Sequence, residues 1–164
     1  MKIWKSVSLI IVLVAIDQIT KIIAKQLLEG KQAFQIIKNI FCFQYLEGGN
    51  TGAAFGMFHN QTWILAIISL ILSVIIIFAI VKLPKKKHFI PLNLSLVFLA
   101  AGAIGNLIDR VFRQYVIDFI YFKAIDFPIF NVADCYVTVS AVVLCLLYLF
   151  YYKEEDFEQL KQIN

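Results

Sequence analysis

Four long apolar stretches constrain this chain more than any other feature of its sequence. They cover about residues 3–23, 63–81, 89–108 and 135–152. A helix needs about 20 mostly apolar residues to cross the hydrocarbon core of a bilayer. The 164 residues are 61% hydrophobic and 16% charged, whereas soluble domains are about 45–50% apolar and about 25% charged. The sequence therefore predicts an all-α membrane protein with four transmembrane helices, folded as a single domain over residues 1–164.

The first apolar stretch also has features of a cleaved signal peptide. Lys2 and Lys5 precede its apolar core, as they would in such a peptide. No small-x-small cleavage site follows, however, and Asp17 and Lys21 are four residues apart. That spacing places them on one helical face, where they can pair. We therefore expect a retained transmembrane helix.

The basic residues predict how the helices are oriented. Their totals on the two sides barely differ, but the segment 82–87 is short and dense in lysine. Because basic residues in short loops favour the cytoplasmic side, we expect this loop and both termini in the cytoplasm. Four aspartates then gather at the outer leaflet, and a site is expected to open on the extracytoplasmic side. These are Asp17, Asp109, Asp118 and Asp134.

Two segments outside the apolar stretches are typical of short strands. Residues 33–46 and 115–122 are rich in Phe, Ile and Tyr. The steps Gly48-Gly49 and Asn50-Thr51-Gly52 are typical of turns between strands. We therefore expect a small extracytoplasmic β-sheet on the outer ends of the helices.

Asp118 and Asp134 are the residues that most suggest chemistry. Each lies beside a long apolar run, and a carboxylate at a bilayer boundary is costly unless something stabilises it. One interpretation is that each residue only caps or anchors its segment, with Asp134 as the N-cap of the last helix. The other is a pair that shares a proton and activates water, since two close carboxylates do not both ionise cheaply.

Two further motifs lie at the outer ends of the second and third apolar stretches. Residues 50–56 combine small residues with one amide, a pattern that also fits a tight turn. At the end of the third stretch, Gly105 and nearby alanines form a thin surface for close helix packing. Asn106 shares a face with Asp109 or Arg110, and the Arg110 guanidinium suits a peptide carbonyl. The alternative is a structural Asp109–Arg110 ion pair.

Several other classes of protein are disfavoured. The basic residues lie at the ends of apolar runs and form no nucleic-acid-binding face. Three widely spaced cysteines show no metal-ligand spacing, and we expect no metal and no cofactor. A proton-coupled transporter would place its acids near the midplane, where both sides can reach them. A non-enzymatic assembly factor would tolerate Asp→Asn at either candidate position.

With these motifs in order, the chain resembles the lipoprotein signal peptidase family, also called signal peptidase II, of bacterial plasma membranes. The resemblance covers essentially the whole chain. Its five motifs are Asp17-Gln18-x-x-Lys21, Asn50-x-Gly52-Ala53-Ala54-Phe55, Gly105-Asn106-x-x-Asp109-Arg110, Val116-x-Asp118-Phe119 and Phe130-Asn131-x-Ala133-Asp134.

This resemblance implies an aspartyl endopeptidase with Asp118 and Asp134 as its catalytic pair. The implied substrate is a prolipoprotein whose cysteine carries a diacylglyceryl group, cut just before that cysteine. The resemblance also implies that the sheet forms a cradle and that the segment between the last two helices forms a lid. It further implies roles in substrate binding or support for Asn106, Arg110, Asn50, Gly52, Asp17, Lys21, Asp109 and Asn131.

The chain departs from its relatives at one nearby position. Gly49 stands where many members of the family carry a larger side chain. We therefore expect the loop before Asn50 to have a shape of its own.

Overall fold

The computed structural model describes residues 1–52 and 61–161. In this part of the chain, four helices are long and apolar enough to cross a membrane. They are α1 (Ile3–Leu28), α2 (Thr62–Lys82), α3 (Ile90–Phe112), which follows a 3-10 turn at Lys87–Phe89, and α4 (Val132–Leu146), which continues as a π-helix over Leu147–Tyr151. The predicted four-helix membrane fold is confirmed. The small-residue motif Ala53-Ala54-Phe55-Gly56 lies outside the described residues.

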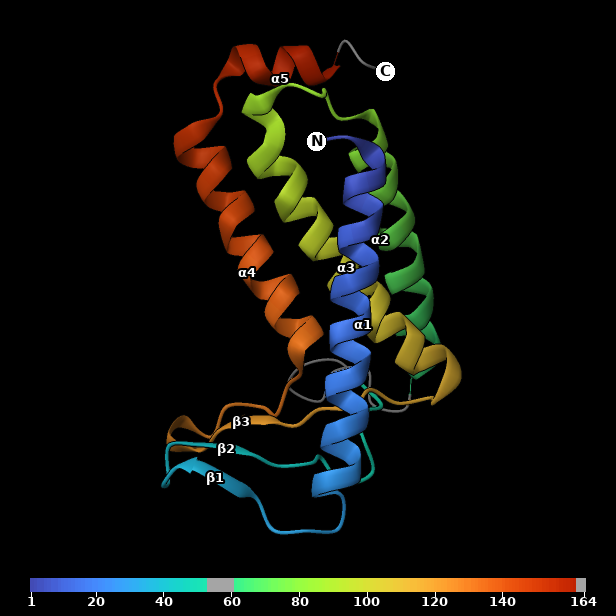
Figure 1. Cartoon of the computed structure of the whole chain (residues 1–164), viewed down its shortest axis with the longest axis vertical. Coiled ribbons are helices and arrows are strands. Elements are labelled where there is room, and N and C mark those ends of the chain that lie inside the picture. Colours follow the sequence, from blue (N-terminus) through green and yellow to red (C-terminus); the bar gives the residue numbers. More distant parts are fainter. Residues whose placement is uncertain (53–60, 162–164) are drawn as a thin grey trace.

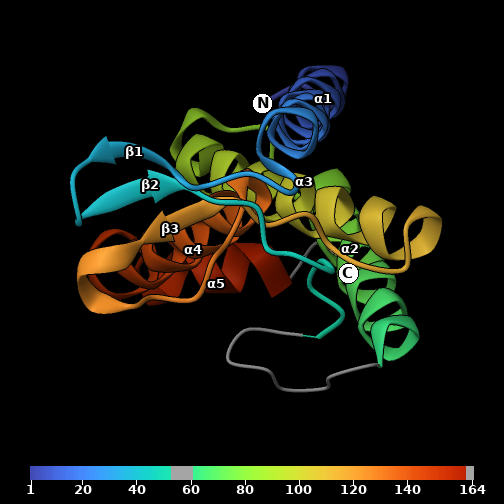
Figure 2. The ribbon, with the colours of Figure 1, turned by 90° about the horizontal axis from the view of Figure 1, so that it is seen from below.

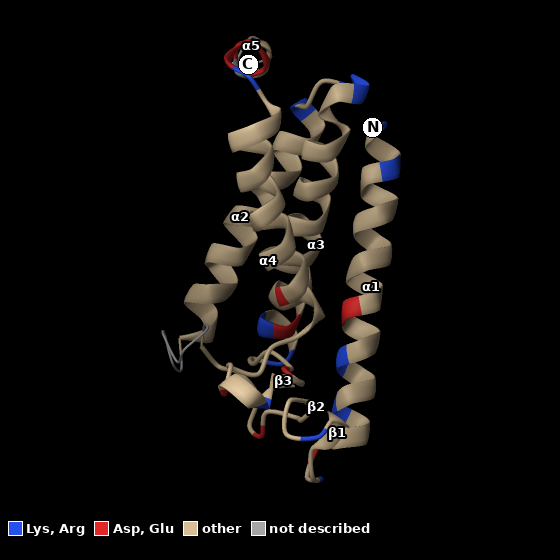
Figure 3. Ribbon diagram, turned by 90° about the vertical axis from the view of Figure 1, so that its left-hand side faces the viewer, with Lys and Arg blue, Asp and Glu red and all other residues tan. Residues whose placement is uncertain are grey.

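The four helices run alongside one another, and a small sheet lies across one end of the bundle (Figure 1). A short helix, α5 (Glu154–Lys161), crosses the opposite end, near the start of α1. Lysines, arginines and acidic residues gather towards the two ends, and long uncharged stretches of helix lie between them (Figure 3). This distribution is the one expected of a bundle that spans a bilayer.

Helix α3 is the centre of the bundle. It packs against α1, α2 and α4. Within its apolar membrane-spanning stretch 44% of the residues are buried, against 11–22% in the corresponding stretches of the other three helices. Small residues allow this close approach. A Cβ atom on Gly102 would lie 2.6 Å from the Ala133 carbonyl oxygen, and one on Gly105 would lie 2.5 Å from Asp17 Oδ2. The small-residue surface thus brings α1 and α4 against the polar end of α3.

The other helices present apolar side chains outward. On α2, Leu70, Ile71, Val74 and Phe78 are all exposed. Such a surface is unfavourable in water and suits lipid.

The helices extend past the apolar stretches at the sheet end of the bundle. We expected the first to end near residue 23 and the third near residue 108, but α1 reaches Leu28 and α3 reaches Phe112. The fourth was expected to begin at Cys135, and α4 begins at Val132. These extra turns carry polar side chains such as Lys25, Asp109 and Asp134, so apolar composition alone does not mark them.

The sheet has three antiparallel strands in the order β1 (Phe34–Ile37), β2 (Phe41–Phe43) and β3 (Ile120–Phe122). Seen from below, the strands lie side by side, with β3 near α4 (Figure 2). Cys42 of β2 faces Tyr121 of β3 and is fully buried. The predicted small sheet is confirmed, and it brings the chain after β2 next to the chain before β3.

Helix α5 is tied to the connection between α2 and α3. The His88 imidazole Nε2 lies 3.0 Å from Asp156 Oδ1, and Lys86 Nζ donates to Gln159 Oε1 at 2.6 Å. The imidazole also stacks on Tyr151 at 5.0 Å between ring centroids. The described part of the C-terminal tail therefore docks on the bundle.

Candidate active site

Asp118 and Asp134 line one cavity of about 880 Å³ at the sheet end of the bundle. Asp118 lies just before β3 and is 1% exposed. Asp134 lies in the first turn of α4 and is partly exposed. The structure therefore brings together two carboxyl groups from different elements, although sixteen residues of sequence separate them.

Asn131 joins the two carboxyl groups. Its Nδ2 donates to Asp118 Oδ1 at 2.6 Å. Its backbone N–H donates to Asp134 Oδ2 at 3.1 Å, and its Oδ1 accepts from the Asp134 N–H at 3.0 Å. The last two bonds form a capping box at the start of α4. Asn131 is thus the N-cap of α4. The interpretation of Asp134 as the N-cap was wrong, because Asp134 lies three residues further along, inside the helix.

Asn50 holds the other oxygen of Asp118. Its Nδ2 donates to Asp118 Oδ2 at 2.8 Å, and its Oδ1 accepts from the Gly52 N–H at 2.9 Å. The backbones of Asn50 and Val116 exchange two hydrogen bonds of 2.9 Å. The predicted turn is therefore present, and it places an amide against the carboxyl group.

Gly49 shapes the approach to Asn50. Its φ is +71°, and a Cβ atom there would lie 2.1 Å from Cδ2 of Tyr115. The Tyr115 hydroxyl accepts from Lys25 Nζ at 2.6 Å, so the ring is held in place. The expected local peculiarity at Gly49 has a physical basis, because the ring occupies the space that a larger side chain would need.

We expect Gly49→Ala to destabilise the protein more than Gly48→Ala does. Both residues have a positive φ, of +71° and +81°, so alanine is strained at each. Only at Gly49 does the new methyl group meet a ring, which adds about 1–3 kcal/mol for overpacking. Thermal unfolding of the two variants in the same detergent measures the difference, and equal stability would contradict the contact with Tyr115.

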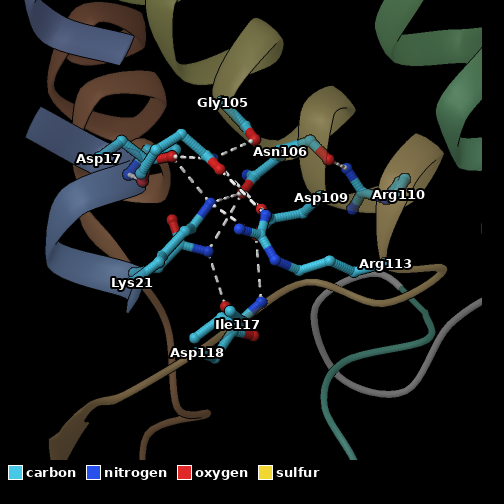
Figure 4. A network of polar contacts seen from close by, with 12 residues as sticks. Asp17, Lys21, Gly105, Asn106, Asp109, Arg110, Arg113, Ile117 and Asp118 are labelled. Atoms are coloured by element: carbon cyan, nitrogen blue, oxygen red, sulfur yellow. Dashed lines mark hydrogen bonds and ion pairs between the residues drawn. The ribbon is translucent and has the colours of Figure 1, made fainter. Parts of the chain in front are cut away.

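A buried lysine is the centre of a polar network next to Asp118 (Figure 4). Lys21 is 0% exposed, and its Nζ lies 2.9 Å from Asp17 Oδ2, 3.0 Å from Asp109 Oδ2 and 2.9 Å from Asn106 Oδ1. The predicted pairing of Asp17 with Lys21 is confirmed. Asn106 in turn donates from Nδ2 to Asp134 Oδ1 at 2.8 Å. A continuous chain of contacts thus runs from α1 through α3 to the carboxyl group on α4.

The two acids of this network tie its elements together. Asp17 Oδ1 accepts from the Ala133 N–H at 3.0 Å, which fixes α1 against the start of α4. Asp109 Oδ2 accepts from the Ile117 N–H at 3.2 Å, which fixes α3 against the segment that carries Asp118. Both acids therefore position the backbone beside the carboxyl pair.

Sequence reasoning missed two members of the network. Arg113 pairs with Asp109, and Gln18 donates to Asp109 Oδ1 at 3.2 Å. The Asp109–Arg110 ion pair that we considered is not the pair that Asp109 makes. The spacing contained the signal, because Arg113 follows Asp109 by four residues on one helical face.

Arg110 lines the cavity beside both carboxyl groups. Its Nη1 lies 3.5 Å from the Asn106 carbonyl oxygen, and its buried Nε has no hydrogen-bond partner among the described residues. A guanidinium has five donors, and this one therefore keeps donors for a ligand in the cavity.

The environment of Asp118 favours a proton on its carboxyl group. Burial and the nearby Asp134 carboxylate raise the pKa of Asp118 to about 7, while hydrogen bonds from Asn50 and Asn131 act in the opposite direction. Two carboxyl groups that interact this closely titrate as a pair. One proton shared by the pair near neutral pH is the state that general acid–base chemistry on a water molecule requires.

The fold and the cavity together define a class, that of multi-pass membrane enzymes with paired carboxyl groups at one end of the helical bundle. A family model described as signal peptidase (SPase) II matches residues 9–150. The chain belongs to the signal peptidase II family, and it is a peptidase.

Individual relatives agree with this assignment. A lipoprotein signal peptidase of Caldanaerobacter subterraneus subsp. tengcongensis is 41% identical over 138 residues, covering 84% of this chain and 90% of the relative. One of Clostridioides difficile is 38% identical, covering 87% and 93%. Among solved structures, a bacterial membrane enzyme determined by the in meso method at 2.3 Å resolution has a TM-score of 0.81 and 28% identity, covering 94% of both chains.

Proposed function

We propose that this peptidase removes the signal peptide from prolipoproteins whose lipobox cysteine already carries a diacylglyceryl group. The cut falls just before that cysteine, and Asp118 and Asp134 activate the attacking water. The observation that carries this proposal is the pair of carboxyl groups joined by Asn131 at one cavity.

Two carboxyl groups with one proton supply what peptide hydrolysis needs. The charged carboxylate removes a proton from water as the water attacks the scissile carbonyl carbon. The neutral carboxyl group donates to the developing oxyanion, and a proton then reaches the leaving amine. We assign no metal and no cofactor to this reaction, because the two carboxyl groups provide both acid and base.

Arg110 suits the substrate backbone. Its guanidinium faces the cavity with donors to spare, and a peptide carbonyl is the acceptor that an extended substrate would offer there. Asn50 and Gly52 also line the cavity, but the Asn50 amide is bonded to Asp118. We therefore assign substrate binding to Arg110 and support of the carboxyl group to Asn50.

The cavity wall supports a lipid-bearing substrate. On the side away from the sheet, the cavity is lined by residues of α4, namely Val137, Thr138 and Val139. An acyl chain gains about 0.8 kcal/mol for each CH₂ that it buries. A lipid held along this wall would fix the depth of the cysteine, so that the bond before it lies at the carboxyl pair.

We place the protein in the bacterial plasma membrane with the cavity on the extracytoplasmic side. The support is the lysine-rich connection after α2, which lies at the end of the bundle opposite the sheet, with the start of α1 and with α5. Basic residues in a short loop favour the cytoplasmic side. Both termini would then be cytoplasmic, and signal peptides would reach the cavity from the outer leaflet.

We expect a prolipoprotein with a diacylglyceryl-modified cysteine to be cleaved far better than the same chain without the lipid. The binding energy of two acyl chains is lost in the unmodified chain, and the scissile bond is then no longer held at the carboxyl pair. Cleavage of matched substrates that differ only in the lipid measures this preference. Equal kcat/KM for the two would refute the role of the lipid.

A further inference from the structure

We propose that Asp134 begins the reaction as the charged base and Asp118 as the protonated acid, with Asn106 as the positioning residue that stabilises the charge on Asp134 and Asn50 as the one that orients Asp118. The proposal rests on the proposed function, and it concerns which member of the pair takes which part. Its basis is the different burial of the two carboxyl groups and the place of Asp134 in the first turn of α4, within a frame of three amide side chains whose orientations are fixed.

Groups that can only donate fix the orientation of all three amides. The Asn106 oxygen accepts from the Lys21 ammonium at 2.9 Å. The Asn131 oxygen accepts from the backbone N–H of Asp134 at 3.0 Å, and the Asn50 oxygen accepts from that of Gly52 at 2.9 Å. An ammonium or a backbone N–H cannot accept, so none of these amides can turn over without losing a bond. Each NH₂ group must therefore face a carboxyl group.

The two carboxyl groups receive different donors. Asp118 accepts from the Nδ2 atoms of Asn50 and Asn131, at 2.8 and 2.6 Å. Asp134 accepts from Asn106 Nδ2 at 2.8 Å and from the Asn131 backbone N–H at 3.1 Å. Asp134 also lies in the first turn of α4, where the helix dipole stabilises a negative charge. Asp118 lies on no helix and lacks this stabilisation.

Burial separates the two carboxyl groups in the same direction. Asp118 is 1% exposed, whereas Asp134 is partly exposed to the cavity from which water must come. A charge on the buried group costs more than a charge on the exposed one. The pKa of Asp118, raised to about 7, agrees with a proton held there near neutral pH.

The surrounding charges come from all the elements packed around the pair. In the described part of the chain, the cations next to the pair are Lys21 and Arg110, and Arg113 neutralises Asp109 behind it. Among residues 1–52 and 61–161, the other titratable groups near the pair are Asp17 and Asp109 in the network, Cys135 on α4 and Glu47 at the cavity. The network of Asp17, Asp109, Lys21 and Arg113 holds two charges of each sign. Arg110 is left as the cation beside the pair, and it balances one charged carboxylate.

The reaction balances with this assignment. Asp134 takes a proton from water while the water oxygen bonds to the scissile carbon, and Asp118 gives its proton to the carbonyl oxygen. The carbon–nitrogen bond then breaks as Asp134 passes its proton to the leaving nitrogen. Asp118 recovers a proton from a hydroxyl group of the tetrahedral intermediate, and both residues return to their starting states.

The pH dependence of kcat/KM tests the assignment through two variants. The acidic limb reports the base and the alkaline limb reports the acid. Removing a donor raises the pKa of the carboxyl group that loses it, by about one unit for a bond to a charged group. Asn106→Leu should therefore move the acidic limb about one pH unit upward, and Asn50→Leu should move the alkaline limb upward. Neither should move the other limb.

Asn93→Leu is the matched control. Asn93 is a buried amide of the same helix, α3, and its Oδ1 accepts from Ser6 Oγ at 3.0 Å, away from the pair. It should shift neither limb. The opposite pattern, with Asn106→Leu moving the alkaline limb and Asn50→Leu the acidic one, would reverse the assignment and overturn the proposal. A fall in activity with no shift in either variant would also overturn it.

Infrared difference spectra between acidic and neutral pH give a second readout that needs no activity. The carbonyl band of a protonated carboxyl group should persist closer to neutral pH in Asp134→Asn than in Asp118→Asn, since Asp118 holds the proton. The reverse order would overturn the proposal even if Asn106→Leu and Asn50→Leu both fail to fold. Unimpaired cleavage by both aspartate variants would instead refute the proposed function.

Discussion

Asp134→Asn is expected to lower prolipoprotein cleavage by roughly 10²- to 10⁴-fold, the usual contribution of general acid–base catalysis. An amide cannot take the proton of the attacking water. Residual cleavage would then depend on Asp118 as an acid, on Arg110 and on the binding of the lipid. The measurement is kcat/KM for a diacylglyceryl-modified substrate, compared between the wild type and the variant at one detergent concentration.

The same variant should still fold, and this separates chemistry from structure. An asparagine at this position can keep one of the two hydrogen bonds to Asn106 and Asn131, but its NH₂ group then faces a donor. The cost is about 1–3 kcal/mol for a donor left unsatisfied. Thermal unfolding and chromatography in detergent check the fold. Full activity of a folded Asp134→Asn variant would contradict the role of the pair.

Lys21→Met should cause one of the largest losses of stability available by single substitution. Methionine has a similar length but leaves Asp17 and Asp109 buried without their shared cation. Breaking a buried ion pair in this way costs about 3–5 kcal/mol. Because Lys21 also holds Asn106, activity should fall in whatever fraction still folds.

Lys25→Met is the control for this substitution. Lys25 lies one turn further along α1 and pairs with Glu29 at 3.8 Å, with both side chains more than a third exposed. An exposed pair contributes about 1 kcal/mol or less, and the bond to Tyr115 adds a similar amount. Chemical unfolding of the two variants in the same detergent compares them. A Lys21→Met protein as stable as Lys25→Met would contradict the buried network.

Much of the fold could be predicted from the sequence because bilayers demand long apolar helices. The four stretches, the sheet and its position at one end all follow from hydropathy and from turn residues. Helix ends were less predictable. The last turns of α1 and α3 carry polar groups whose partners come from other elements, as Lys25 bonds to Tyr115 and Asp109 to Lys21, and no local pattern reveals this.

The candidate site was predictable in its residues but not in its contacts. Asp118 and Asp134 were conspicuous because each lies beside an apolar run. The part of Asn131, which caps α4 and bonds both carboxyl groups, depends on a turn of helix that hydropathy did not assign. Likewise the Tyr115 ring over Gly49 joins residues that are far apart in the sequence, and only the fold brings them together.

The position of the carboxyl pair also bears on the rival class. A proton-coupled transporter needs acids that both sides of the membrane can reach. Here Asp118 lies just before β3 and Asp134 in the first turn of α4, both lining the cavity, and these elements meet at the sheet end of the bundle (Figure 1). This one-sided arrangement suits an enzyme that meets its substrate at one surface.

Mass spectrometry of the cleavage products tests the central claim most directly. Purified wild type and Asp118→Asn, each shown to be folded, are mixed with the same diacylglyceryl-modified prolipoprotein in detergent. We predict that only the wild type releases a product that begins at the lipidated cysteine. Cleavage at that bond by both proteins, or by neither, would contradict the assignment of this carboxyl pair to prolipoprotein processing.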